Sequence, residues 1–456
     1  MNRDRSRSEI VEKLFGVNLE QQGRGFYIGL EMLAVARGVL EVDRDLVLDS
    51  GEGNLRYVRT SHDFARRIAA NAEIDPSALK RAIDGDETLA TVKALTSSLV
   101  IDIPGRRKTS SWYNSHFYPF VGQLVHYDAT ERHQKGSPRG SKQPKIERYV
   151  YRDGGSWAYR ALRTDQNRDR RETNRNGLVE LLRDSDSPLA EIARALQSHD
   201  YAVKEQYEDR SEPNIAVCEE KSPWPGHLRQ GVSSIVSRTS VPRAKRIESL
   251  MHWVPYCLGR HQLHLARRSL GKPTETVYTD FLNGPTPLRR MSQNALDEHR
   301  MDIVNALIEK ATELHNNAQR ISDSASAERY AKHMSREAKG TVSARAFYSE
   351  TLAAVGALNA TTGRRHFTLK PAMLEALVAA ALQPGEEMEY HAFCARTYET
   401  FSLLIDERTA GRNDLTFDID SSVFSRNSAA FHSQLSATGL LTQYSDATSI
   451  VHGEPR

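Results

Sequence analysis

Apolar side chains recur at helical spacing along one long segment in the middle of the chain, residues 242–270. Residues three, four or seven apart lie on one face of an α-helix, and an apolar face of this kind packs against a core. The residues in this pattern are Ile247, Met251, Val254, Leu258 and Leu265. The pattern therefore predicts a long central helix that is buried on its apolar side.

Helical spacing also dominates much of the remaining chain. The further segments predicted to be helical are residues 8–40 (two helices), 168–183, 188–198, 291–321, 329–339 and 344–358. Segments 291–321 and 329–339 are expected to pack as an antiparallel pair. Strand signals are few, and one of them is the apolar run 99–103 before Pro104 and Gly105. The predicted fold class is mainly α with minor β.

The last ninety residues show the clearest order of elements. Residues 371–382, 388–405 and 422–437 predict three helices, and residues 441–444 and 447–451 predict a small β-hairpin after Gly439. Three helices followed by a hairpin resemble a winged-helix domain. This resemblance is to a fold and implies no single activity.

Breaks in the pattern divide the chain into four predicted regions. They are an N-terminal helical domain (1–104), a basic α+β region (105–222), a central helical domain (223–366) and the winged-helix-like domain (367–456). Within the second region, residues 132–145 lack a hydrophobic anchor and predict a mobile loop. Asp153-Gly154-Gly155 stands between two apolar runs and predicts a β-hairpin over residues 146–162.

Composition narrows the class of protein. No stretch approaches the roughly 20 apolar residues of a membrane span, and the charged start of the chain lacks the apolar core of a signal peptide. The three cysteines, Cys218, Cys257 and Cys394, are far apart, as is usual in a reducing compartment. We therefore expect a cytoplasmic protein with no membrane partner. Since the P-loop and dinucleotide-binding motifs are absent from the sequence, we expect no cofactor.

Charge is small in total, at +3, but unevenly distributed. Residues 105–182 carry sixteen Lys or Arg and eight Asp or Glu, whereas residues 367–456 carry six and twelve. Cations beside aromatic side chains suit contact with a nucleic-acid backbone and stacking on bases. The predicted nucleic-acid-binding residues are Arg106, Arg107, Lys108, Trp112, Lys135, Arg139, Lys142, Lys145, Arg243, Lys245 and Arg246. The alternative for the first group is a buried aromatic cluster beside a solvated loop.

The cations of the central segment admit a second interpretation. They are spread around the predicted helix, so some of them must pair with acids elsewhere. The set is Arg243, Lys245, Arg246, Arg260, Arg267 and Arg268.

The winged-helix-like region is a weak candidate for reading DNA. Its third helix offers Ser425, Arg426, Asn427, Ser428, His432 and Gln434, of which only Arg426 is a fixed cation. Neutralisation of phosphate supplies most non-specific affinity for DNA. An acidic domain is therefore expected to contact a protein rather than DNA.

Two further sets of residues could carry chemistry. Cys257, His261 and His264 share one helical face and could contribute to a zinc site, although a buried structural role is favoured for the cysteine. Asp209, Glu219 and Lys221 resemble the acid and lysine pattern of the restriction-type nuclease fold, in which carboxylates hold Mg²⁺. Both sets are kept as alternatives to a protein without catalytic or metal residues.

The layout as a whole is a basic helical body with no enzyme motif and a winged-helix end. It resembles accessory subunits of bacterial DNA-defence (anti-phage) islands, which work beside an ATPase, nuclease or methyltransferase. The resemblance implies a non-catalytic adaptor, whose basic middle contacts DNA or RNA and whose acidic tail contacts a protein partner. The alternatives are a metal-dependent nuclease and a purely structural interaction protein.

Overall fold

The structure of the protein is a computed structural model, which describes most of the chain. The described residues are 5–17, 19, 25–43, 46, 48, 55–62, 119–125, 127–133, 142–146, 154–196, 203–209, 221–338, 344–360, 364–415, 419–445 and 448–455. Helices make up most of these residues, so the predicted class, mainly α with minor β, is confirmed.

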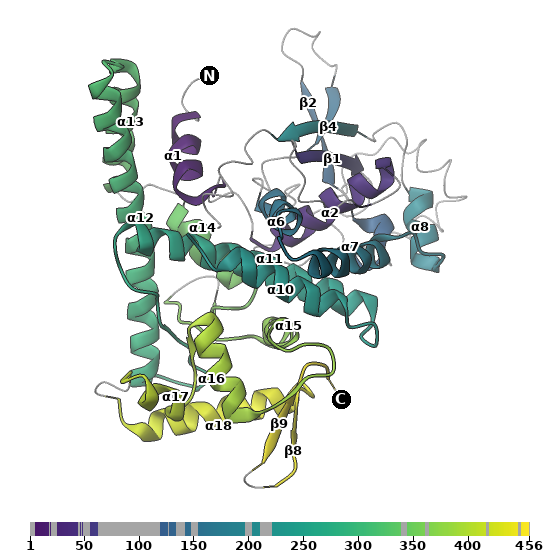
Figure 1. The fold of residues 1–456 in the computed structure, drawn as a ribbon, viewed down its shortest axis with the longest axis vertical. Helices are drawn as coiled ribbons and strands as arrows, with labels where there is room; N and C mark the ends of the chain where they lie inside the picture. Colours follow the sequence, from purple (N-terminus) through teal and green to yellow (C-terminus); the bar gives the residue numbers. More distant parts are fainter. Residues whose placement is uncertain are drawn as a thin grey trace.

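Helix α11 (Arg243–Ser269) crosses the middle of the molecule (Figure 1). All five apolar residues that predict it are buried, and Pro255 does not interrupt it. On one side of α11 pack α2 (Gly25–Asp43) and α6 (Gly154–Arg163), and on the other side packs α15 (Pro371–Ala381). One continuous apolar core runs from Ile10 to Val451 through these layers.

The other helices of the body surround this centre. They are α1 (Arg5–Phe15), α7 (Arg168–Leu182), α8 (Pro188–Leu196), α10 (Trp224–Val236), α12 (Pro287–Arg320), α13 (Ser324–Ala338) and α14 (Ala344–Ala354), with the short 3-10 helix η2 (Gly122–Leu124). Helices α12 and α13 form the expected pair and stand along one flank (Figure 1).

A four-stranded sheet lies beyond α2, with strand order β3-β2-β1-β4. Its strands are β1 (Leu55–His62), β2 (Tyr127–His133), β3 (Lys142–Ile146) and β4 (Val203–Asp209). β1 and β2 are parallel, and the other two pairs are antiparallel. His133 faces Lys142 in the register of the β2–β3 pair. The ends of the predicted loop 132–145 therefore belong to strands, and only residues 134–141 lie outside the described residues.

The hairpin predicted over residues 146–162 is wrong. Gly154 and Gly155 begin helix α6, and the reason is a close approach to α2. A Cβ on Gly155 would stand 2.4 Å from the backbone nitrogen of Met32, and the Gly155 N–H donates to Glu31 Oε2 at 2.6 Å. A carboxylate at this position also stabilises the positive end of the helix dipole. The two glycines serve helix packing and not a turn.

The C-terminal part carries a second, three-stranded sheet. After α15 come β6 (Glu387–Glu389), α16 (Tyr390–Phe401), β7 (Leu403–Leu404), α17 (Glu407–Arg412), α18 (Ser421–Ala437), β8 (Leu441–Gln443) and β9 (Ser449–His452). The strand order is β6-β9-β8, and both pairs are antiparallel. Strand β7 pairs in parallel with β5 (Val277–Tyr278) of the body, which fixes this part to the body.

Candidate functional site

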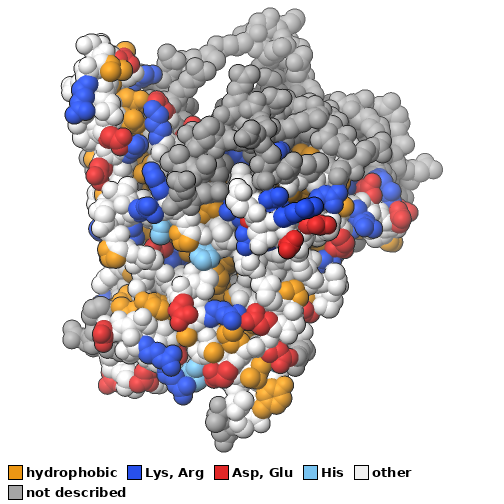
Figure 2. Space-filling view, viewed as in Figure 1, with side chains coloured by type: hydrophobic (Ala, Val, Ile, Leu, Met, Phe, Trp, Pro, Cys, Tyr) orange, Lys and Arg blue, Asp and Glu red, His pale blue; other side chains and the backbone are white. Residues whose placement is uncertain are grey.

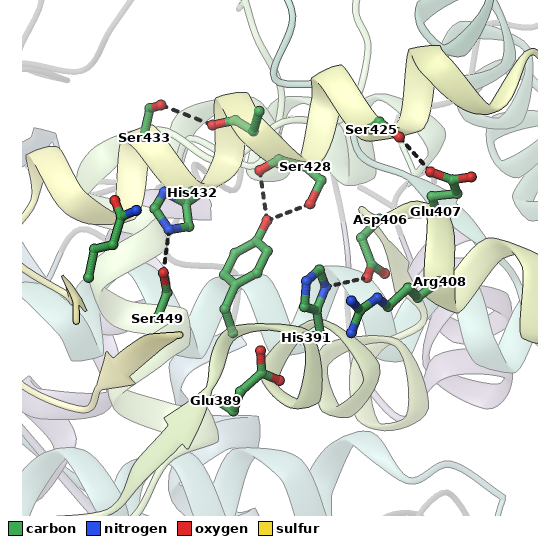
Figure 3. Close-up of a pocket in the computed structure, with 13 residues that line it drawn as sticks. Glu389, His391, Asp406, Glu407, Arg408, Ser425, Ser428, His432, Ser433 and Ser449 are labelled. Carbon is green, nitrogen blue, oxygen red and sulfur yellow. Dashed lines mark hydrogen bonds and ion pairs between the residues drawn. The ribbon is translucent and has the colours of Figure 1, made fainter. Parts of the chain in front are cut away.

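A cleft of about 520 Å³ opens on the C-terminal part, between α16, the start of α17, one face of α18 and the β8–β9 hairpin (Figure 3). Its lining is polar. The side chains are Glu389, Tyr390, His391, Asp406, Glu407, Arg408, Ser425, Ser428, Ala429, His432, Ser433, Gln443 and Ser449.

Helix α18, which forms one wall of the cleft, is held in place by a side chain that points away from the cleft. Asn427 of α18 is fully buried. Its amide donates to the carbonyl oxygens of Thr279 and Ile405 at 2.9 Å each, and its Oδ1 accepts from the Phe281 N–H at 2.8 Å. One side chain thus ties α18 to the β5 segment and to the β7 segment. The cleft wall is therefore preorganised by the body.

Two acids of the cleft also begin helices. Glu389 accepts from the Ala392 N–H at 2.9 Å and caps α16, and Asp406 accepts from the Thr409 N–H at 3.2 Å and caps α17. A carboxylate at this position satisfies an N–H that has no partner within the helix. These carboxylates are consequently fixed in direction.

Hydrogen bonds between the lining residues order the interior of the cleft (Figure 3). The Tyr390 hydroxyl donates to the Ser428 carbonyl at 2.7 Å, and His432 Nε2 lies 2.8 Å from Ser449 Oγ. Ser425 donates to Glu407. Burial raises the pKa of Tyr390, and burial together with the nearby His391 lowers the pKa of His432. Both groups are therefore neutral at pH 7 and act as hydrogen-bonding groups.

His391 Nδ1 lies 3.4 Å from Asp406 Oδ2, and both side chains point into the cleft. Arg408 lies beside them and makes no hydrogen bond or ion pair with any described residue. Three carboxylates against one guanidinium leave the cleft acidic. It can therefore hold a polar ligand that brings hydrogen-bond donors or positive charge.

Residues of α18 named from the sequence separate into two groups. Ser425, Ser428 and His432 line the cleft, whereas Asn427 is buried and Gln434 donates to the Leu369 carbonyl at 2.6 Å. Asn427 and Gln434 are therefore engaged in contacts within the protein. On the face in Figure 2, acidic and basic side chains of the described residues are interspersed.

Most of the predicted nucleic-acid-binding residues of the basic region cannot be placed. Arg106, Arg107, Lys108, Trp112, Lys135 and Arg139 lie outside the described residues. Lys142 and Lys145 lie on β3, opposite His133 and Thr130 of β2. These two lysines are thus part of a hairpin and not of a loop.

The three central cations named with them have partners within the chain. Arg246 is buried and holds Glu180 with both terminal nitrogens, at 2.7 and 3.2 Å. Arg243 donates to the carbonyl oxygens of Leu181 and Arg183 at 2.6 Å each, which closes the end of α7. Lys245 lies 2.8 Å from Glu248 and 3.4 Å from Glu375. The pairing of central cations with acids elsewhere is confirmed.

The zinc alternative does not fit the described side chains. Both ring nitrogens of His261 are used, since Nδ1 lies 3.0 Å from Ser222 Oγ and Nε2 lies 3.2 Å from the Phe15 carbonyl. Cys257 is fully buried, and burial raises the pKa of its thiol. Within the described ranges, no group of three or more His, Cys, Asp or Glu side chains is arranged to hold a metal ion, His264 included.

The nuclease set is only partly placed. Asp209 ends β4, and Lys221 stands in an exposed turn before α10. Glu219 and the apolar run 215–218 lie outside the described residues. The nuclease set therefore stays a prediction.

Sequence reasoning missed His391, Asp406 and Arg408. The signal that could have found two of them is the run Asp406-Glu407-Arg408, which directly follows the apolar Leu403-Leu404-Ile405. His391 lies fifteen positions earlier, and only the turn of the chain between α16 and α17 brings it to Asp406.

Comparison with protein-family models, curated proteins and solved structures finds no match for this chain. Among the described helices, none combines the length and the apolar character that crossing a membrane requires.

Proposed function

We propose that this protein is a non-catalytic, nucleic-acid-associated adaptor of the cytoplasm. In this proposal the basic region 105–222 contacts DNA or RNA, and the C-terminal cleft contacts a protein partner. The observation that carries the proposal is the cleft itself, which is polar, acidic and rigidly fixed to the body through Asn427.

The C-terminal part serves in this proposal as a winged helix of the protein-binding kind. Its element order (α15, β6, α16, β7, α17, α18, β8, β9) and its strand order β6-β9-β8 support that assignment. The exposed face of α18 consists largely of serine and alanine with Arg426, which favours a protein over the phosphate backbone of DNA. The three carboxylates of the cleft are complementary to a basic segment of the partner.

The partner is expected to be an ATPase, nuclease or methyltransferase, as the resemblance to accessory subunits of DNA-defence islands implies. A photo-crosslinking amino acid at Ser433, inside the cleft, tests this in cells, with Ser436 on the same helix but outside the cleft as the control position. We expect one dominant partner at position 433 and a much weaker product at position 436. Equal products at both positions, or none at 433, would overturn the assignment of the cleft.

Contact with nucleic acid is tested separately. Binding to labelled double- and single-stranded oligonucleotides is titrated with salt in the presence of Mg²⁺, and the probes are then run on a gel. We expect intact probes and binding that weakens steeply with salt, because each phosphate contact releases counterions. Charge reversal at Arg106, Arg107, Lys142 and Lys145 should abolish this binding. Cleaved probes would instead support the nuclease alternative, and no binding at low salt would leave a purely structural role.

A further inference from the structure

A second cleft, of about 310 Å³, lies where α1 meets the end of α11 and the middle of α12. Its walls come from four segments far apart in the sequence. They contribute Lys13, Leu14, Lys221, Leu265, Arg268, Ser269, Ala306, Glu309, Lys310 and Glu313. In Figure 1, α1 stands beside the α12–α13 pair at this place.

Four cations converge on this cleft, one from each segment. Lys13 and Lys310 are neutralised on their own helices, at 2.8 Å from Glu9 and 2.8 Å from Glu313. Lys221 and Arg268 are different, since both are exposed and neither pairs with a carboxylate of any described residue. Arg268 Nη1 donates instead to the Lys221 carbonyl at 3.1 Å, which holds the two residues together.

The titratable groups around the four cations are neutral or acidic. His264, one turn before Arg268, is half-buried, and its pKa is lowered first by burial and also by the positive charges of Arg268 and Arg260, against the opposing effect of Glu275. The neutral imidazole therefore adds no charge to the cleft. The carboxylates that face the cleft are Glu309 and Glu313, both on α12, and Glu313 is held by Lys310.

We propose that this cleft binds a phosphate group, with Arg268 and Lys221 as the residues that contact it. A guanidinium offers two parallel donors to phosphate oxygens, and a lysine adds a mobile point charge. Leu14, Leu265 and Ala306 give the cleft apolar walls beside the cations, which suit the sugar or base that accompanies a phosphate. The site extends the proposed function to a described surface, but it does not depend on it, because a free nucleotide carries the same chemistry.

The test compares wild type with the double variant Lys221→Gln/Arg268→Gln. Arg320→Gln, which removes an exposed cation of α12 outside the cleft, is the control. Two probes are used, a labelled single-stranded oligonucleotide under salt titration and tripolyphosphate in calorimetry. For the oligonucleotide we expect at least a tenfold loss of affinity at low salt, and a salt slope smaller by about two because two phosphate contacts are lost. The control should keep the wild-type values.

The two probes distinguish the source of the phosphate and separate this proposal from the preceding one. Loss of oligonucleotide binding identifies a nucleic-acid backbone as the ligand. In a second outcome, wild type binds tripolyphosphate but no oligonucleotide, and the double variant binds neither. That outcome supports the phosphate site and overturns the nucleic-acid role. If wild type binds neither probe, or the double variant binds both as well as Arg320→Gln does, the phosphate site is overturned. The thermal unfolding of each variant shows whether a loss of binding reflects a loss of fold. The single variant Lys221→Gln is measured in the same way.

Discussion

Helices α11 and α18 both carry many polar side chains, but they place them differently. On α11 the polar groups lie largely inside the protein. Arg260 is 1% exposed and donates to Glu275 and Tyr256, at 2.8 and 2.9 Å, below the ring of Trp224. On α18 one polar residue, Asn427, is internal, and a row of serines faces an open cleft. The difference teaches that a count of charges along a helix predicts neither its exposure nor its partners.

The largest expected effect comes from breaking the buried pair of α11. Glu275→Gln leaves the Arg260 charge without a counter-charge in the core, and we expect a loss of about 3–5 kcal/mol in the free energy of unfolding. Urea unfolding followed by circular dichroism measures it. Glu298→Gln is the matched control. The Glu298 side chain is exposed, and its partners Arg267 and Lys272 both keep Asp302, so this change should cost less than about 1 kcal/mol. Equal effects of the two variants would contradict the contrast between buried and exposed pairs.

The internal side of α18 should show the next largest effect. Asn427→Ala leaves one N–H and two carbonyl oxygens unpaired in the core, and we expect a loss of about 3 kcal/mol in unfolding free energy. Ser436→Ala, on the exposed side of the same helix, should change it by less than about 0.5 kcal/mol. If Asn427→Ala unfolds at the same urea concentration as wild type, the anchoring role assigned to this side chain is wrong.

The pH dependence of stability tests the buried side of α11 through one of its histidines, His261. Burial lowers the pKa of His261 to about 3, below its ordinary value of 6.5. Between these two values the unfolded chain binds a proton that the folded protein does not bind, so stability is present at neutral pH and is lost as the pH falls. We expect His261→Gln, which retains a donor and an acceptor, to flatten the fall of the unfolding free energy from pH 6.5 to pH 4. An unchanged slope would show that His261 takes up its proton in the folded state.

The smallest effect on stability should come from the cleft. Arg408→Glu removes a cation that contacts no described partner, so the unfolding free energy should change by less than about 0.5 kcal/mol. The crosslinked product at position 433 should nevertheless change in yield, since the cleft gains a fourth carboxylate and loses its one guanidinium. A large loss of stability would mean that Arg408 is structural.

Sequence reasoning located the helices well because their apolar spacing is regular, as in α11 and α12. It failed at Gly154-Gly155, where the same dipeptide fits a turn or a tightly packed helix. The deciding residue, Glu31, lies more than a hundred positions earlier in the chain and comes close only in the folded state. The same reason hid the cleft, since His391 and Asp406 meet only after the chain turns between α16 and α17. Local pattern predicts elements, whereas sites depend on contacts that the pattern does not contain.

The most direct test of the central claim is a salt titration of nucleic-acid binding by Arg246→Gln beside Lys142→Glu/Lys145→Glu. If the cations of α11 that hold internal partners are structural, Arg246→Gln keeps wild-type affinity and salt slope while its unfolding free energy falls, because Glu180 loses both of its hydrogen bonds. The β3 double variant should instead lose affinity with little change in stability. A loss of affinity in Arg246→Gln at unchanged stability would contradict the claim and would place Arg246 at the nucleic-acid surface.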